Sequence, residues 1–250
     1  MKPGFRDAYS LKVAQCLEKH STIPGLYLAH RVCLTREQYP ELIKRYPDLE
    51  YAVLCPWIEG RTWAGLMMDS AVSALYSFEY AKGLALALSY VLWNLEAHSL
   101  AHTDIAGGNV LLGPDFKQVQ LIDLESMYVP HVKLPKKLSR GSPGYQFPYL
   151  DNRGQCCPEG DRFAGAIMLT EMLTWWHPSV RAVTPDEAES LFAPNELQRQ
   201  DFPCWQRVRK VLYQCSPTIL ALFDQAWQAT SLKECPDFGS WSMALVSAFM

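Results

Sequence analysis

Residues 101–112, which read AHTDIAGGNVLL, hold the polar side chains on which the interpretation of the whole chain depends. Before them, residues 70–98 carry apolar side chains at helical spacing, in one wide stripe. The end of this stretch, residues 109–112, and the later residues 119–122 are mainly apolar and flank a turn that contains Gly, Pro and Asp. We therefore predict a long buried helix, a polar loop and a compact β-hairpin, in that order.

The loop and the hairpin are expected to bring three oxygen-bearing side chains together. Asp104 and Asn109 lie in the same tight loop, and Asp123 follows the second strand of the hairpin. Hard divalent cations such as Mg²⁺ bind oxygens of this kind and leave further positions to water and phosphate. The sequence therefore predicts that these three side chains converge at one end of the hairpin.

The composition limits the class of protein. The chain has 250 residues, of which 49% are hydrophobic and 20% are charged, and its net charge is −3. This is ample material for a packed core, and the weak net charge provides no basic field for nucleic acid. No apolar stretch follows the charged first residues as in a signal peptide, and none is long enough to span a bilayer. We expect a soluble protein with no nucleic-acid or membrane partner.

The cysteines indicate the compartment. None of the eight forms a C-x-x-C pair, and no histidine pair stands beside them at zinc spacing. Free thiols of this kind are typical of a reducing environment, so we expect a cytoplasmic protein.

The first 58 residues are predicted to be rich in strands. Short apolar or alternating segments indicate three of them, at residues 9–14, 26–34 and 50–55. Lys12 lies inside the first segment, and Pro56 ends the third. Residues 35–46 are charged and are predicted to form a short helix or a loop, interrupted by Pro40.

The rest of the chain is predicted to be helical. Residues 163–176 are almost entirely apolar, which indicates a core helix, and amphipathic patterns follow over residues 219–229 and 241–249. We therefore expect an α+β fold in two lobes. The small lobe, residues 1–58, would be reduced and antiparallel, and the large lobe, residues 59–250, would be helical.

The motifs of this chain resemble those of the protein kinase superfamily. The template H-R-D-L-x-x-x-N, followed by D-F-G, is matched in part by residues 102–109 and 123–125. Three further segments resemble the kinase hinge, the end of the activation segment and the buried aspartate of the large lobe, at residues 51–60, 140–148 and Asp161. The sequence is similar to divergent bacterial serine/threonine protein kinase-like domains, which implies the bilobal protein kinase-like fold.

The resemblance implies ATP and Mg²⁺ as cofactors and a protein or peptide as substrate. Asp104 would orient the acceptor hydroxyl and accept its proton, and Asn109 and Asp123 would hold Mg²⁺ against the phosphates. Lys12 would reach the α- and β-phosphates from its strand.

The resemblance also implies an adenine site at the hinge. The Pro56 carbonyl and the Ile58 amide would bind adenine, and the missing N–H of proline does not affect that role. Cys55 would take the gatekeeper place at the back of the adenine pocket.

The start of the chain departs from the kinase pattern. No glycine-rich loop precedes Lys12, so either the chain is truncated or nucleotide is held weakly or not at all. Lys12 is then either a phosphate ligand or a plain edge-strand lysine. The glutamate that would pair with it stays open among Glu18, Glu37 and Glu41.

Other departures lie within the motifs. Thr103 replaces the arginine that pairs with a phosphorylated activation loop, which indicates that control does not use that route. Glu125 replaces the glycine of D-F-G and is either a further metal ligand or, in the preferred interpretation, a solvated acid. Residues 147–149 lack the acid of A-P-E and its ion pair. The basic residues within 133–140 form a solvated surface or a docking patch for an acidic partner.

The leading interpretation is ATP- and Mg²⁺-dependent phosphoryl transfer to serine or threonine hydroxyls of proteins. One alternative is a pseudokinase, a scaffold or regulator with little or no turnover, which the missing glycine-rich loop favours. A second is a small-molecule kinase of the aminoglycoside or choline type, which shares the catalytic loop but lacks a segment like residues 141–145. The sequence leaves the substrate and the oligomeric state open.

Overall fold

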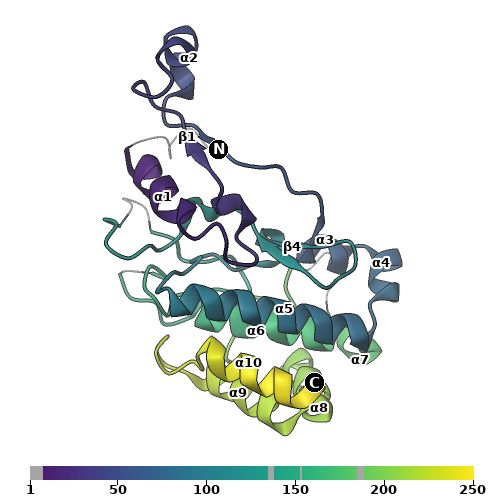
Figure 1. Ribbon diagram of the computed structural model, residues 1–250. Helices are drawn as coiled ribbons and strands as arrows, with labels where there is room; N and C mark the ends of the chain where they lie inside the picture. The colour runs from purple at the N-terminus through teal and green to yellow at the C-terminus, as the bar shows by residue number, and fades with distance from the viewer. Residues whose placement is uncertain (1–7, 135–137, 153, 185–188) are drawn as a thin grey trace.

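The computed structural model describes residues 8–134, 138–152, 154–184 and 189–250 (Figure 1). Helices make up about 49% of the described residues and strands about 6%, and the strands form small antiparallel sheets. The chain is therefore a mixed α+β protein, as the sequence predicts.

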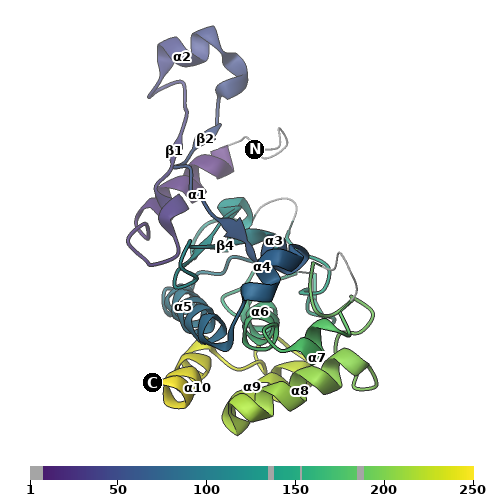
Figure 2. The same cartoon turned by 90° about the vertical axis from the view of Figure 1, so that its right-hand side faces the viewer.

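The helical body is built around α5 (Phe78–Ala97) and α6 (Arg162–Thr174), which pack against each other. α10 (Phe238–Phe249) lies along α5, while α8 (Pro203–Cys215) and α9 (Pro217–Gln228) pack on α6 (Figures 1 and 2). Every residue of α6 after Arg162 is buried, because other elements surround this apolar helix. The body thus has a buried central helix under several amphipathic ones.

These helices confirm the three helix predictions for the second half of the chain. The prediction missed α8, although its buried residues recur at helical spacing: Cys204, Val208, Val211 and Leu212. A short helix, α7 (Pro178–Arg181), follows α6 and is capped by the side chain of His177.

The predicted long helix over residues 70–98 is in fact two helices. Asp69 caps α4 (Ser70–Leu75), and Ser77 caps α5; each side chain accepts hydrogen bonds from N–H groups in the first turn of its helix. Such caps favour a new helix start at each position. The predicted apolar stripe is confirmed within α5, where its members are buried: Leu84, Leu88, Val91, Leu92 and Leu95.

The predicted hairpin is confirmed. β4 (Val110–Leu112) pairs antiparallel with β5 (Val119–Leu121). A strand that the prediction missed, β3 (Arg61–Thr62), adds to the other edge of β4. Thr62 then caps α3 (Trp63–Met68), so the chain passes directly from the sheet into the body.

The segment that was predicted as the first strand is a helix. α1 (Ala8–Glu18) contains Lys12, and its buried residues Val13, Ala14 and Leu17 recur at intervals of one, three and four. Six residues of alternation resemble a strand, but the same apolar residues continue into a helical stripe over eleven. Lys12 is therefore exposed on a helix and is not a strand residue.

The other two predicted strands are much shorter than expected. β1 (Val32–Cys33) pairs antiparallel with β2 (Val53–Leu54) in a two-stranded ribbon. Part of the predicted strand at residues 26–34 is a single 3-10 turn, Tyr27–Ala29.

Between the two ribbon strands, the chain projects away from the body (Figure 2). The projection holds α2 (Pro40–Arg45) and a 3-10 turn, Pro47–Leu49. Pro40 begins α2 instead of interrupting a helix, because the first helical position needs no N–H donor. A small separate core forms there, from the buried residues Leu34, Ile43 and Ala52.

The main hydrophobic core is continuous from Val13 in α1 to Leu245 in α10. It therefore crosses the predicted boundary at residue 58, and the division into residues 1–58 and 59–250 stays a prediction. Within the described residues, no helix has the length and apolar character needed to cross a membrane. All eight cysteines are free thiols, as predicted.

Candidate functional site

The loop after α5 is held in place by a buried carboxylate. Asp161 accepts hydrogen bonds from the backbone N–H of His102 at 2.5 Å and of Thr103 at 2.8 Å. Its side chain does not cap α6, although the residue directly precedes that helix. Burial raises the pKa of Asp161, and the two N–H donors oppose that shift. Asp161 is therefore a buried aspartate, as the resemblance implies, and its side chain fixes the loop instead of capping its own helix.

Thr103, which stands where kinases have an arginine, makes uncharged contacts. Its backbone is left-handed, with φ of 66°. Its hydroxyl donates to the Ser126 carbonyl at 2.9 Å, and its own carbonyl accepts from the Ser139 hydroxyl at 2.8 Å. The loop is thus tied to the two segments that follow it in the chain.

Asp104 and Asn109 are in contact, as predicted. The Asn109 amide donates to the Asp104 carbonyl at 2.8 Å and to Oδ2 of its carboxylate at 3.3 Å. The other carboxylate oxygen, Oδ1, accepts a hydrogen bond from the Ser142 hydroxyl at 2.8 Å. An aliphatic hydroxyl therefore already lies at the carboxylate that was predicted to receive one.

Asp123 lies at the same end of the hairpin. The N–H of Ile122 donates to the Asn109 carbonyl at 3.0 Å, which extends the pairing of β4 and β5 by one residue. Asp123 follows with a left-handed backbone, φ of 60°, and its side chain is exposed. Buried His102 contacts the Ile122 carbonyl through Nε2 at 2.7 Å and serves packing there. The loop that holds Asn109 and the end of the hairpin that holds Asp123 are thus joined by a backbone hydrogen bond.

The predicted metal ligands would form an incomplete coordination shell by themselves. Within the described ranges, no group of three or more His, Cys, Asp or Glu side chains could hold a metal ion. Asn109 and Asp123 offer one amide and one carboxylate oxygen, which suit Mg²⁺ because it keeps several waters and binds substrate phosphates. The donor set therefore fits a metal that arrives with a nucleotide.

A buried arginine that the sequence analysis missed pairs with Glu125, two residues after Asp123. The side chain of Arg31 is 2% exposed, and its Nη1 lies 3.9 Å from Oε1 of Glu125. Burial lowers the pKa of Arg31, and the charges of Glu125, Cys55 and Asp123 oppose that shift. Arg31 stood in a predicted strand with no motif around it; a charged residue inside an apolar run was its only signal.

Glu125 is neither a free solvated acid nor part of a preformed metal cluster in the described chain. Burial raises its pKa most, the hydrogen bond and the charge of Asp123 raise it further, and Arg31 lowers it. Its ion pair with Arg31 links the D-F-G-like segment to β1.

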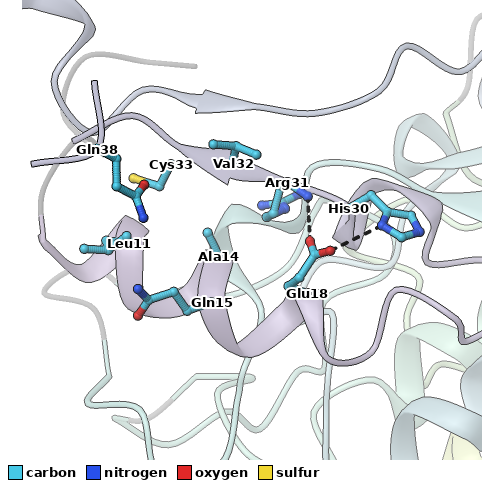
Figure 3. A pocket seen from close by; sticks show the side chains of 9 residues that line it. All are labelled: Leu11, Ala14, Gln15, Glu18, His30, Arg31, Val32, Cys33 and Gln38. Atoms are coloured by element: carbon cyan, nitrogen blue, oxygen red, sulfur yellow. Dashed lines mark hydrogen bonds and ion pairs between the residues drawn. The ribbon is translucent and has the colours of Figure 1, made fainter. Parts of the chain in front are cut away.

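No contact in the described part of the chain joins Lys12 to the loop or the hairpin. It is exposed on α1, whereas Glu18 on the same helix accepts from the Arg31 backbone N–H at 3.1 Å and contacts His30 Nδ1 at 3.4 Å. Figure 3 shows Glu18 and Arg31 in a pocket of about 540 Å³ between α1 and β1, whose lining does not include Lys12. Glu37 and Glu41 are both exposed, and Glu41 lies on the α2 projection. None of the three glutamates is observed as a partner of Lys12 in the described structure.

The predicted hinge residues follow β2. Cys55 is exposed, while Pro56 and Ile58 are partly buried. Ile58 packs against the main core, and Trp57 between them is 89% exposed. The segment therefore runs between the ribbon and the body, and its adenine role stays a prediction.

The segment that resembles the end of an activation segment is anchored by Glu171. The Tyr145 hydroxyl lies 2.7 Å from Oε2 of this buried carboxylate, which also accepts from Trp63 Nε1 at 2.9 Å. Its other oxygen accepts from the Ser190 hydroxyl at 2.7 Å and the Leu191 N–H at 2.8 Å. Burial raises the pKa of Glu171 to about 7, against these four donors. The anchor that A-P-E would supply is thus taken by a residue of α6.

The structure describes part of the predicted basic run within residues 133–140. Lys133 and Arg140 are exposed, and Lys136 and Lys137 lie outside the described residues. The choice between a solvated surface and a docking patch stays open.

No model of a known protein family matches the chain, and a search of curated proteins found no similar sequence.

Proposed function

We propose that this chain catalyses ATP- and Mg²⁺-dependent phosphoryl transfer to serine or threonine hydroxyls of a protein, in a divergent bilobal protein kinase-like fold. The observation that supports this best is the environment of Asp104. One of its oxygens accepts a serine hydroxyl at 2.8 Å, and the other faces the Asn109 amide at 3.3 Å. A substrate hydroxyl in the place of Ser142 would be oriented in the same way.

Asp104 would act on the acceptor side of the reaction. Phosphoryl transfer passes through a loose transition state, so positioning and neutralisation of charge contribute most of the catalysis. The carboxylate of Asp104 would hold the acceptor hydroxyl in line and take its proton as the new O–P bond forms, while the bond from the γ-phosphorus to the bridging oxygen breaks and ADP leaves. The contacts of Asp161 and Ser139 with the loop would keep that carboxylate in place.

Asn109 and Asp123 would act on the nucleotide side. When bound, Mg²⁺ supplies positive charge that neutralises the phosphates. Asn109 is fixed by its bond to the Asp104 carbonyl, and Asp123 by the end of β5. Cys55, Pro56 and Ile58 would contact adenine, as the resemblance implies.

A pseudokinase is the second candidate, supported by the position of Lys12. This side chain is exposed on α1 instead of lying in a strand, and no described contact joins it to Asp104, Asn109 or Asp123. A small-molecule kinase is less well supported, because residues 141–147 form an anchored segment next to Asp104 that such enzymes lack.

Free thiols agree with the proposed cytoplasmic location.

Thermal unfolding with ATP, in Mg²⁺ or in chelator, tests nucleotide binding first. ATP at a hundred times its Kd would stabilise the native state by about 2.7 kcal/mol. We expect a shift in Mg²⁺ that is much smaller in chelator and is reduced in Asp123→Asn. Equal shifts with and without metal would contradict the metal assignment, and no shift at all would contradict nucleotide binding.

A transfer assay then separates the two candidates. With labelled ATP and a peptide mixture rich in serine and threonine, the parent should transfer phosphate and Asp104→Asn should not, while both bind ATP equally. Asp201→Asn is a matched control, because Asp201 is exposed and pairs only with nearby Arg199 among the described contacts. A parent that binds ATP but transfers no phosphate would support the pseudokinase, and an active Asp104→Asn would overturn the role of Asp104.

A further inference from the structure

Arg31 is a buried cation beside the candidate nucleotide site. It precedes β1, and its Nη1 lies 3.9 Å from Oε1 of Glu125, which follows Asp123 by two residues in the segment after β5. Lys12, in contrast, is exposed on α1. The described cation that pairs with the segment after β5 therefore comes from the residue just before β1.

The hydrogen bonds of Arg31 leave donors for a ligand. Nε donates to the Leu28 carbonyl at 2.9 Å, which fixes the direction of the side chain. The 3.9 Å separation of Nη1 from Glu125 Oε1 is an ion-pair distance but is too long for a hydrogen bond. The terminal nitrogens thus keep donors that a phosphate could accept in a bidentate way.

The charges around Arg31 also favour the binding of Mg²⁺ together with phosphates. Asp104, Asp123 and Glu125 bring three carboxylates to this end of the hairpin, and Arg31 is the cation within ion-pair distance of Glu125 in the described structure. A buried charge acts more strongly than an exposed one, because little water screens it. Mg²⁺ would offset the carboxylates, and Arg31 would offset phosphate oxygens that the metal does not cover.

We propose that Arg31, held by Glu125, binds the phosphates of the nucleotide in the place expected for Lys12. The pair Arg31–Glu125 then corresponds to the cation and carboxylate that kinases use to position phosphates. This inference rests on the proposed nucleotide site. Arg31 is a binding residue in it, and Glu125 is a positioning residue.

The competing interpretation is that Arg31 only braces β1 against the hairpin. A brace supports the whole site, so its loss would weaken adenosine and ATP alike. If Arg31 binds phosphate, it contributes only to the affinity for ATP, since adenosine has no phosphates. The ratio of the two affinities therefore separates the two roles.

The experiment measures the affinities of Mg²⁺-ATP and adenosine by calorimetry for the parent, Arg31→Gln, Arg31→Lys, Lys12→Gln and Arg36→Gln. Arg36 is the matched control arginine, exposed and paired with Glu50 at 3.0 Å. Arg31→Gln should weaken Mg²⁺-ATP roughly tenfold to a hundredfold, as for a lost hydrogen bond to a charged group, with adenosine within about twofold. Arg36→Gln should change neither affinity by more than about twofold.

Arg31→Lys keeps the charge and serves as the test if Arg31→Gln does not fold. It should lose several-fold in ATP affinity and none in adenosine affinity, since an ammonium cannot bind phosphate in the bidentate way. Equal losses for ATP and adenosine, or a selective loss in Lys12→Gln instead, would overturn the proposal. A parent that binds neither ligand would refute the proposed function as well, whereas an Arg31→Gln variant that binds Mg²⁺-ATP and adenosine as tightly as the parent does would refute only the role of Arg31.

Discussion

Two regions supply the candidate site, and they differ in how directly their sequence predicts their structure. The front segment, residues 8–55, holds α1 and the β1–β2 ribbon, while the loop and hairpin, residues 101–125, hold Asp104, Asn109 and Asp123. The hairpin formed as predicted, because its strands and turn are adjacent in the chain. The front segment did not, because its few strand residues pair across a twenty-residue separation and α1 is defined by the core it meets.

The largest effect is expected where the loop is tied to the body. Asp161→Ala should lower the free energy of unfolding by about 4 kcal/mol, because it leaves two buried backbone N–H groups without their charged acceptor. Urea denaturation measures the change. The control variant Asp201→Ala, at an exposed ion pair, should lower the free energy of unfolding by less than about 1 kcal/mol. A loss as small as that of the control would mean that Asp161 does not hold the loop.

The second largest effect is expected in α1, which should unfold together with the helical body. Leu17→Ala should cost about 3 kcal/mol in the same global transition, since Leu17 has no exposed surface and lies in the main core. A separate early transition, with the main midpoint unchanged, would instead show that the front segment unfolds on its own.

The anchor of residues 141–147 should make stability depend on pH. Because the pKa of Glu171 is raised to about 7, the native state binds a proton more readily than the unfolded chain, whose pKa is near 4.5. Its contribution is full below about pH 4.5 and is lost as the pH rises through about 7, on the order of 2–3 kcal/mol.

Denaturation of the parent and of Glu171→Gln between pH 4.5 and 7.5 isolates this contribution. The parent should lose stability over that range relative to the variant. Parallel profiles would contradict a raised pKa and would favour an ionised Glu171 with its four donors.

The smallest global effect is expected at the α2 projection. Ile43→Ala should move the global midpoint by less than about 1 kcal/mol, since its small cluster is separate from the main core. Amides of α2 should exchange with solvent markedly faster than in the parent, while those of α6 keep their protection. Equal loss of protection in both helices would show that the projection and the body unfold together.

The sequence predicted the parts of the site that are close along the chain. The contact of Asp104 with Asn109 spans five residues, and the loop geometry sets it almost alone. The contacts of Glu171 with Trp63 and of Asp161 with His102 span 108 and 59 residues, so only the packed body creates them. Arg31 and Glu125 likewise meet from distant segments. The placement of Lys12 failed because six alternating residues cannot distinguish a strand from the start of a longer helical stripe.

The ties that hold residues 101–104 have a consequence for the entropy of binding. The Ala101–Tyr128 bridge, the Asp161 carboxylate and the Ser139 hydroxyl already remove most of the conformational freedom of this loop. A ligand that contacts Asp104 would therefore order little additional chain there. The entropic cost of forming the complete site would fall instead on the front segment, whose ribbon has only two short strands.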